Sequence, residues 1–326
     1  MKIVCSIVAF NSASDLPPCL EAVANQTVAV ETVVLDNASH DGSAEIARRF
    51  GVETLFSGRN LGFSEGHNRI LIGRPFDYAW VLNPDCRPHS DYLERLLQAM
   101  QESGADMAQG KLLRMDERGQ PVESAPGPVL DSAGMYFTPA QRHFDRGSGQ
   151  ADRGQYDKRQ EVFGVTAAAA LYSRRLLDAV RFEDEYFDAD FFAYREDADL
   201  CWRARLLGFR ALYEPAARAL HRRHVLPRRR RRIEDALNLH SLKNRFLMRI
   251  KNMDAPVARR CFPWMQMRDA GIRAYVLFGE RSSREAYREV RRLRGRMLDK
   301  RTVLEEKGSW ADLSPWFDFR PQAFDL

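Results

Sequence analysis

The first 113 residues alternate short apolar stretches with segments in which apolar residues recur at helical spacing. The apolar stretches predict strands and the periodic segments predict helices. Repeated β-α-β units of this kind form a doubly wound, mostly parallel sheet, so the predicted fold class is α/β. We expect strands at residues 2–10, 31–37, 52–56, 78–82 and 107–113, and helices at 15–26, 41–50, 64–72 and 91–101.

The regular pattern stops after the fifth predicted strand. Residues 113–160 are rich in glycine, proline, aspartate and arginine, which predicts an irregular, partly antiparallel insertion. An apolar run at 162–172 and a helix at about 196–207 follow. Beyond Pro215 the chain becomes basic, and helices are expected near 233–250, 264–278 and 283–299.

Charge is distributed unevenly along the chain. The 326 residues carry 50 Lys+Arg against 45 Asp+Glu, a formal net charge of +5. The segment from Arg218 to Arg301 holds 25 basic and 8 acidic residues, a net of +17, which leaves −12 on the remainder. We therefore expect an α/β domain at 1–224 and a basic, mostly helical region at 225–326. Such a region attracts anionic partners: ligand phosphates, a lipid surface or nucleic acid.

Composition bounds the class and the compartment of the protein. With 44% hydrophobic residues and no apolar run near the ~20 residues of a membrane span, the sequence predicts a packed soluble protein. Residues 1–10 are expected to form the first strand and not a signal sequence, because no small-residue cleavage site follows. The five cysteines form no Cys-x-x-Cys pair, which argues against a disulfide framework and favours the cytoplasm.

Asp36-Asn37 and Asn83-Pro84-Asp85 end two of the predicted strands, at the edge where such sheets bind ligands. Four clusters stand out, at residues 6–11, 35–43, 59–68 and 82–85, and a further one follows at 187–203. In their order and spacing, these clusters resemble the family-two glycosyltransferases of the GT-A fold, and most nearly the bacterial rhamnosyltransferase-like branch. The resemblance extends to about His221, roughly two thirds of the chain. It implies an enzyme that moves a sugar from a nucleotide-sugar donor to a hydroxyl acceptor.

The resemblance places the nucleotide base near the ends of the first two strands. Asp36 would accept a hydrogen bond from the imide N–H of uracil or thymine, which implies a UDP- or dTDP-linked donor. Ala9 and Asn11 would flank the same base. From the residues alone, Asp36 is equally a helix cap or turn residue, and Asn11 a turn former.

A glycine-bearing segment before the next helix would pass the ribose and the diphosphate. Further nucleotide contacts are expected at Asn60, Gly62, Asn68 and Asn83. Gly62 permits close backbone approach, and the helix that follows offers N–H groups to a phosphate. A loop of this kind is common in α/β proteins, so by itself it indicates little.

Asn83-Pro84-Asp85 stands where metal-dependent GT-A enzymes more often have Asp-x-Asp. By the resemblance, Asp85 would hold Mg²⁺ or Mn²⁺. His221 would be a second protein ligand that partly replaces the carboxylate absent at Asn83, with His224 as the alternative histidine. A strand-end turn at Asn83 and an ordinary structural histidine are the structural alternatives.

The Glu196-Asp197 pair is the leading catalytic candidate. The resemblance maps Asp197 to the base that takes the acceptor proton, with Glu196 in support. The alternative is a helix N-terminus, where the helix dipole favours acidic residues. Gly164 and Arg203 are expected to contact the acceptor. A buried strand at Gly164 and an ion pair between Asp199 and Arg203 are the structural alternatives there.

Five consecutive arginines, Arg228–Arg232, precede the basic helices. Basic amphipathic helices are typical of proteins that bind an anionic membrane surface, which we expect here. Packing on the core or on a second subunit, as an oligomer, is the alternative. We expect no nucleic-acid partner, because no recognised module accompanies the arginines.

These observations favour an inverting, metal-assisted glycosyltransferase of cell-surface polysaccharide synthesis. The acceptor is expected to be a glycan or lipid-linked saccharide, met in the cytoplasm or at the inner face of the membrane, and dTDP-rhamnose is the donor suggested by likeness. A sugar-phosphate nucleotidyltransferase expects a lysine-bearing phosphate loop, which residues 11–15 do not form. A non-enzymatic basic protein that binds membrane or nucleic acid leaves Asp36, Asp85 and Asp197 unexplained.

Overall fold

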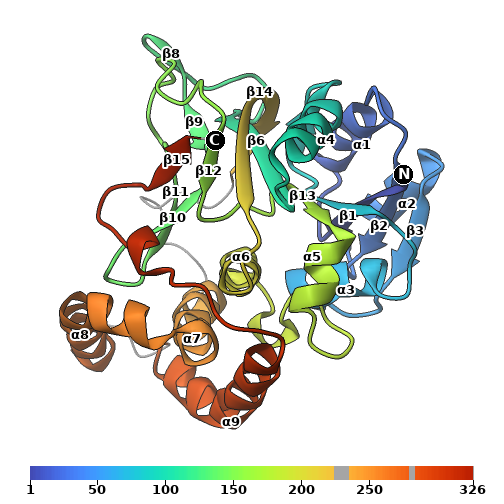
Figure 1. Cartoon of the computed structure of the whole chain (residues 1–326). Coiled ribbons are helices and arrows are strands. Elements are labelled where there is room, and N and C mark those ends of the chain that lie inside the picture. Colours follow the sequence, from blue (N-terminus) through green and yellow to red (C-terminus); the bar gives the residue numbers. More distant parts are fainter. Residues whose placement is uncertain (224–234, 279–282, 326) are drawn as a thin grey trace.

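A computed structural model describes residues 1–223, 235–278 and 283–325 (Figure 1). Two 3₁₀ turns, η1 (Ala189–Phe191) and η3 (Ser314–Trp316), accompany the α-helices. The helices within these residues are α1 (Leu16–Ala24), α2 (Ser43–Arg49), α3 (Gly62–Leu71), α4 (Tyr92–Ser103), α5 (Arg174–Val180), α6 (Glu196–Leu206), α7 (Asp235–Asn252), α8 (Ala255–Phe278) and α9 (Arg284–Glu306).

The strands belong to one large sheet and two short hairpins, β7–β8 and β10–β11. They are β1 (Ile3–Ala9), β2 (Glu31–Asp36), β3 (Glu53–Phe56), β4 (Tyr78–Leu82), β5 (Cys86–Pro88), β6 (Met107–Arg114), β7 (Glu123–Ser124), β8 (Gly127–Pro128), β9 (Leu130–Ser132), β10 (Met135–Phe137), β11 (His143–Asp145), β12 (Gln160–Val162), β13 (Ala169–Ser173), β14 (Ala211–His221) and β15 (Ala323–Asp325). The region between β6 and β12 thus consists of very short strands.

The large sheet follows the order β15-β12-β14-β6-β13-β4-β1-β2-β3. β4, β1, β2 and β3 are parallel, and so are β6 and β14, whereas β13 runs antiparallel between β4 and β6. The α/β class expected from the sequence is confirmed. Ala9 lies beside Asp36 in the β1–β2 register, so the ends of these two strands share one edge of the sheet.

Helices cover both faces of the sheet. On one face, α1 and α4 pack on a buried cluster that includes Leu20, Leu96 and Trp80. On the other face, a second cluster joins α3, α5 and α6 to the C-terminal helices. Neighbouring residues of β1 divide between the two clusters, since Val4 belongs to one and Cys5 to the other. This alternation is the strand period of two.

β14 was not expected from the sequence, where Pro215 suggested that the ordered sheet had ended. The strand runs on through this proline to His221. Its pairing with β6 shifts register between Glu214 and Arg218, which is a bulge. A proline is tolerated at a bulge because its missing N–H is not needed for the ladder there. The continuation carries His221 into register with Cys86 of β5.

The C-terminal helices agree broadly with the expected positions, although residues 224–234 lie outside the described part. α8 begins nine residues earlier than expected and continues through Pro263. Figure 1 shows α7, α8 and α9 together at one end of the molecule, beside α6. Met248 of α7 and Met297 of α9 belong to the same buried cluster as Trp202 of α6. The division near residue 224 stays a prediction.

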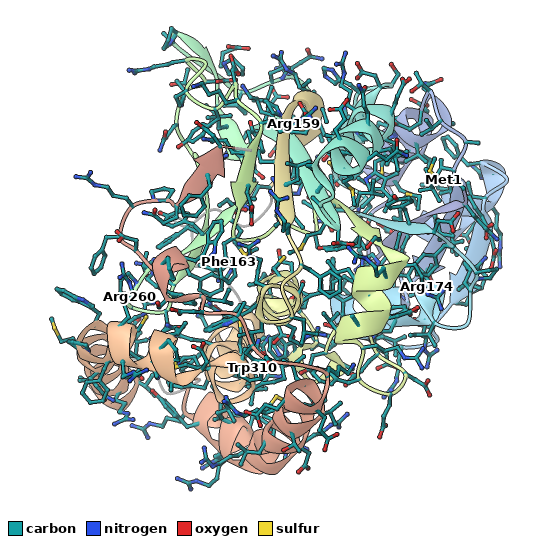
Figure 2. The ribbon with its side chains drawn as sticks, in the orientation of Figure 1. Met1, Arg159, Phe163, Arg174, Arg260 and Trp310 are labelled. Atoms are coloured by element: carbon teal, nitrogen blue, oxygen red, sulfur yellow. The ribbon has the colours of Figure 1, made fainter. Side chains whose placement is uncertain are left out.

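The chain after α9 returns to the sheet. β15 pairs antiparallel with β12, so it forms an edge of the sheet. On the way, Phe317 packs on Phe163, which lies in the interior between the sheet and α6 (Figure 2). Among the helices of the described residues, none is both long and apolar enough to cross a membrane.

Candidate active site

Asp36 ends β2 with its carboxylate only partly used. The side chain is 6% exposed, and its Oδ2 accepts a hydrogen bond from the Ser39 N–H at 3.3 Å. Its Oδ1 is buried without a hydrogen-bond partner among the described residues. An unpaired buried acceptor is costly, so this oxygen is suited to a donor that a ligand brings, such as an imide N–H.

Ala9 and Asn11 shape the loop that surrounds Asp36. The Ala9 C=O accepts the Asn37 N–H at 2.8 Å. Asn11 is in the left-handed region, with φ 50°, and its Oδ1 accepts the His40 N–H at 2.9 Å. Both residues therefore brace the turn after β2, and a contact with the base stays a prediction.

The segment before α3 is tied to β2 by Asn37, which the sequence reasoning did not select. Asn37 accepts the Leu61 N–H at 2.8 Å and donates to Asn60 Oδ1 at 3.0 Å. Asn60 Oδ1 also accepts the Gly62 N–H at 2.8 Å. Gly62 has φ +76°, and a Cβ there would lie 2.4 Å from the Phe192 carbonyl oxygen. The close approach at Gly62 is thus made by the protein's own backbone, and nucleotide contacts at Asn60 and Gly62 stay predictions.

Asn68 was expected to contact the nucleotide, and the structure corrects this expectation. Its Oδ1 accepts the N–H groups of Tyr186 and Phe187, both at 2.9 Å. Its Nδ2 donates to the Phe187 carbonyl at 2.7 Å. With 5% exposure and both ends of the amide engaged, Asn68 joins α3 to the segment before α6 and is not available to a ligand.

Asp85 and His221 lie together, as the sequence suggested. His221 Nε2 is 3.3 Å from Asp85 Oδ1, and His221 Nδ1 is 2.8 Å from Asp131 Oδ2. Asn83 starts the turn that carries Asp85, since its C=O accepts the Cys86 N–H at 3.1 Å. Asp131, on β9, was not selected from the sequence because nothing local marks it within the irregular region. His224, the alternative ligand, lies outside the described residues.

The arrangement of His221 between Asp131 and Asp85 fits a histidine that serves as a metal ligand. A carboxylate holds Nδ1, so Nε2 faces the other carboxylate, which is the second-shell arrangement of many metal sites. Within the described ranges, no three His, Cys, Asp or Glu side chains are grouped to hold a cation. Asp85 and His221 are the two residues that would hold Mg²⁺ or Mn²⁺, with ligand or water oxygens for the rest.

The charge of His221 reflects the same neighbours. Burial opposes the protonated imidazole, but Asp85 and Asp131 outweigh it and raise the pKa of His221 to about 10. The imidazole is therefore cationic between two carboxylates in the protein alone. Because a metal ligand must be a neutral imidazole, loading a cation would release this proton.

Glu196 and Asp197 begin α6 with different environments. Asp197 Oδ1 accepts its neighbour Ala198's N–H at 2.7 Å, and Oδ2 accepts the Ala167 N–H at 3.4 Å. Burial, reinforced by the charge of Asp145, raises the pKa of Asp197 to about 6. Burial and the charge of Asp197 raise the pKa of Glu196 well above its usual range. At neutral pH, Asp197 is mainly a carboxylate, whereas the upward shift of the Glu196 pKa favours its protonated form.

A chain of charges links Asp197 to the candidate metal ligands. Arg223 pairs with Asp145 and, through its Nε at 3.1 Å, with Asp131. Asp145 and Arg223 both lie near enough to Asp197 to shift its pKa in opposite directions. Asp131 in turn holds His221. The structure thus brings Asp85 and Asp197 into one charged cluster, through His221, Asp131, Arg223 and Asp145.

The two expected acceptor contacts are corrected by the structure. Arg203 is fully buried, and it donates to the carbonyl oxygens of Val180 and Tyr186 at 2.5 and 2.8 Å and to Asp199 at 2.9 Å. The ion pair between Asp199 and Arg203, which was the structural alternative, is therefore present. A Cβ at Gly164 would lie 2.6 Å from the Cβ of Cys201, so α6 occupies the space expected for a sugar.

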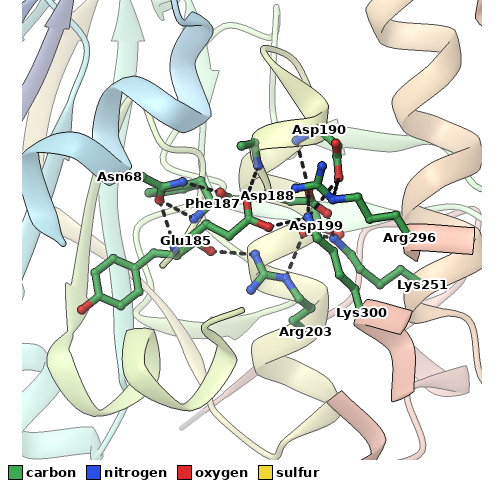
Figure 3. Close-up of polar contacts among 12 residues, drawn as sticks. Asn68, Glu185, Phe187, Asp188, Asp190, Asp199, Arg203, Lys251, Arg296 and Lys300 are labelled. Atoms are coloured by element: carbon green, nitrogen blue, oxygen red, sulfur yellow. Dashed lines mark hydrogen bonds and ion pairs between the residues drawn. The ribbon is translucent and has the colours of Figure 1, made fainter. Parts of the chain in front are cut away.

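Behind α6 lies a buried cluster of opposite charges (Figure 3). Lys251 of α7 contacts Asp188 and, at 3.0 Å, Asp199. Lys300 of α9 contacts Asp188 at 2.6 Å. Both lysines hold the pKa of Asp188 far below its usual range against its burial. The cluster joins α7 and α9 to the segment that precedes Glu196.

Solved structures with the same fold are glycosyltransferases. S. aureus TarS 1–349 in complex with UDP-GlcNAc superimposes with a TM-score of 0.58 at 15% identity, covering 100% of this chain and 99% of that one. The mannosyltransferase PcManGT from Pyrobaculum calidifontis, in complex with GDP-Man and Mn²⁺, gives 0.52 at 15% identity over 93% and 80%. The fold is therefore GT-A, the fold of nucleotide-sugar-dependent glycosyltransferases.

The family follows from the sequence comparisons. The model of glycosyl transferase family 2 matches residues 5–181. Glycosyltransferase AglE of Haloferax volcanii is 32% identical over 119 residues, 32% of this chain and 36% of the relative. The N-acetylglucosaminyl-diphospho-decaprenol L-rhamnosyltransferase of Mycobacterium tuberculosis is 29% identical over 211 residues, 59% of this chain and 66% of the relative. The chain belongs to glycosyl transferase family 2.

Family membership confirms the expected enzyme class, a glycosyltransferase. It decides against the nucleotidyltransferase and against a purely non-enzymatic basic protein. The chain spans about a third of the length of AglE and about two thirds of that of the rhamnosyltransferase.

Proposed function

We propose that this glycosyltransferase transfers a sugar from a UDP- or dTDP-linked donor, with inversion, to a hydroxyl of a glycan or lipid-linked saccharide. The observation that carries the proposal is the placement of Asp197, an ionised but half-buried carboxylate, in one charged cluster with Asp85 and His221. A base and a diphosphate-binding pair are the two groups that a single displacement at an anomeric carbon needs.

In this mechanism, separate residues bind the nucleotide, hold the cation and activate the acceptor. Asp197 accepts the proton of the attacking hydroxyl, and Glu196 beside it orients the acceptor. Asp36 accepts the imide N–H of the pyrimidine and fixes the nucleotide at the sheet edge. Asp85 and His221 would hold Mg²⁺ or Mn²⁺, which supplies electrostatic stabilisation of the departing diphosphate.

The donor and acceptor are proposed from the relatives. The rhamnosyltransferase named above supports dTDP-rhamnose as donor and a lipid-linked saccharide as acceptor in cell-surface polysaccharide synthesis. A thermal-shift series with UDP-, dTDP- and ADP-sugars, with and without Mn²⁺, tests the donor. We expect stabilisation by a pyrimidine nucleotide and none by ADP-sugars, because adenine has no imide N–H to donate to Asp36. Equal stabilisation by ADP-sugars would contradict the role of Asp36.

The base is tested by Asp197→Asn. The amide has nearly the shape of the carboxylate but cannot take a proton at neutral pH. We expect unchanged nucleotide affinity by calorimetry and a loss of transfer of roughly 10²–10⁴-fold, the usual contribution of a positioned base. Undiminished turnover by this variant removes Asp197 as the base.

We also propose that the protein works in the cytoplasm, at the inner face of the membrane, and that α8 provides the contact. Large apolar side chains are exposed along this helix: Phe262, Trp264, Met267 and Tyr275. Arg259 and Arg273 are exposed on the same helix, whereas its acidic residue, Asp269, is buried. Exposed aromatic and basic residues without exposed acids fit an anionic lipid surface.

A further inference from the structure

The turn before the Glu196-Asp197 pair has an unusual backbone. Phe192, Tyr194 and Arg195 have φ values of 64°, 70° and 73°, in the left-handed region. Bulky residues rarely adopt this conformation, because the side chain crowds the backbone. Such a turn persists only where its surroundings hold it, and strained turns of this kind cluster at functional sites.

One side of the turn is held by α3. The Phe192 carbonyl oxygen accepts the N–H groups of Phe63 at 2.6 Å and of Ser64 at 3.3 Å. These N–H groups belong to the first turn of α3, where helix donors lack partners within the helix. The turn is thereby fastened to the segment that follows the proposed nucleotide loop.

The other side is held by one stretch of α7. Asn244 Nδ2 lies within hydrogen-bond distance of three carbonyl oxygens, those of Phe191 at 2.9 Å, Ala193 at 2.9 Å and Tyr194 at 2.7 Å. Lys243 Nζ donates to the Asp190 carbonyl at 2.6 Å.

Two further contacts join the same stretch of α7 to the turn. Arg195 Nε donates to the Ser241 carbonyl at 3.0 Å. The ring of His240 stacks on Phe192 with centroids 4.8 Å apart. One face of α7 therefore binds almost every residue of the turn.

Asn244 is the central contact of this face. It is fully buried, and its Oδ1 has no hydrogen-bond partner in the part of the chain that the structure describes. An apolar side chain would fill the space without burying an unpaired oxygen. The amide instead supplies two N–H donors, which satisfy the buried carbonyl groups of Phe191, Ala193 and Tyr194.

We propose that Asn244 is a positioning residue for the transfer reaction: through the three carbonyl groups it fixes the turn that aims Asp197 at the acceptor. The inference rests on the proposed role of Asp197 as the base. It assigns a catalytic purpose to the C-terminal helical region, beyond its packing on the core.

The test compares two isosteric variants of the same contact region. Asn244→Asp removes the N–H donors, and Asp269→Asn, the matched control, removes the ion pairs by which α8 holds α7, at 2.9 Å from Arg245 and 2.8 Å from Arg249. We expect Asn244→Asp to lower kcat on the order of 10²-fold, as small misplacements of reacting groups do, with nucleotide affinity within twofold of the wild type. Asp269→Asn should lower the melting temperature and leave kcat within about threefold.

The pH profile gives a second readout. A looser turn exposes the Asp197 carboxyl to water, so the acidic limb of kcat/KM in Asn244→Asp should move to lower pH than in the wild type, and in Asp269→Asn it should not move. If Asn244→Asp does not fold, Lys243→Met, which removes the contact with Asp190, should show the same kcat-selective loss. Equal losses of kcat in Asn244→Asp and Asp269→Asn, with no shift of the limb, would overturn the inference.

The two proposals fail in different ways. If Asp197→Asn retains turnover, the base assignment is wrong and the positioning role falls with it. If Asp197→Asn is inactive and Asn244→Asp, or Lys243→Met in its place, transfers at the wild-type rate, the base stands and Asn244 has no positioning role.

Discussion

At the scale of single residues, the candidate site contains two adjacent acidic residues that are chemically alike but lie in different environments. Glu196 and Asp197 are adjacent, yet burial and the charge of Asp197 raise the pKa of Glu196 well above its usual range, whereas the pKa of Asp197 rises to about 6. Divergent environments of this kind are how two carboxyl groups take separate roles at one pH.

This difference predicts the acidic limb of activity. Asp197 must be ionised to act as base, and its pKa is raised from 3.8 to about 6. Activity should therefore be complete above this pH and fall roughly tenfold per unit below it. Rates measured from pH 4.5 to 8, with circular dichroism as the control for unfolding, check the limb. A limb near pH 4 would show that the carboxyl is not buried as described.

Asp131 offers a test of the candidate metal ligands. Asp131→Asn leaves the His221 ring without its carboxylate partner, and loss of such a partner typically weakens metal affinity about 10–100-fold. The measurement is Mn²⁺ binding by calorimetry in the presence of UDP. Asp152→Asn, which loses an ion pair with Lys111 in the same irregular region, is the control. Equal Mn²⁺ affinity in both variants would count against His221 as a ligand.

Residue by residue, the sequence singled out candidates that sit in recognisable strings and missed residues that do not. Asp36, Asp85, Glu196 and Asp197 follow strands or begin a helix. Asp131 and Asn244 lie in segments without a motif, and their partners are 90 and about 50 positions distant. Only the folded chain brings such residues to their partners, so periodicity carries no signal for them.

At the scale of elements, α3 and the turn before α6 are packed too closely to tolerate a side chain at Gly62. Gly62→Ala brings a Cβ to 2.4 Å from the Phe192 carbonyl oxygen. We expect a loss of about 1–3 kcal/mol for the overlap, added to about 1 kcal/mol for φ +76°.

Gly58 provides the control for that substitution. Its φ is +71°, and nothing lies within 4 Å of a Cβ built there. Gly58→Ala should show the backbone cost alone. Chemical denaturation measures the loss of stability in both variants. Equal losses would mean that the turn at Phe192 shifts to accommodate the added methyl group, and would contradict the close packing described here.

Apart from β5, which was not predicted, the strands and helices of the first 113 residues were predictable because each is a single local pattern. β14 was not, because Pro215 usually ends a strand and only pairing with β6 shows that it occupies a bulge. β15 was missed for a similar reason, since three residues at the end of the chain have no periodicity of their own.

At the scale of the whole molecule, the surface of α8 predicts membrane binding. Arg259→Glu, Arg273→Glu and Phe262→Ser together should abolish co-sedimentation with vesicles that contain phosphatidylglycerol, since each basic residue near an anionic leaflet contributes about 1 kcal/mol. The wild type should not bind vesicles of phosphatidylcholine alone.

The control for this surface is on α2, at the opposite end of the molecule from α8 (Figure 1). Arg48→Glu, Arg49→Glu and Phe50→Ser change the same kinds of exposed residue there. Unchanged sedimentation of the α8 variant would contradict the proposal. A change in oligomeric state, without a change in lipid binding, would assign the face to a second copy of the chain.

The contacts of α7 and α9 with the segment before Glu196 have a consequence for folding during synthesis of the protein. Chains tend to fold from the amino end as they leave the ribosome. The sheet edge at Asp36 and Asp85 can form early, but Asn244 and Lys300 emerge later. With the roles proposed above, a nascent chain should therefore bind nucleotide before it can transfer sugar, and transfer should begin only after α7 and α9 have been synthesised.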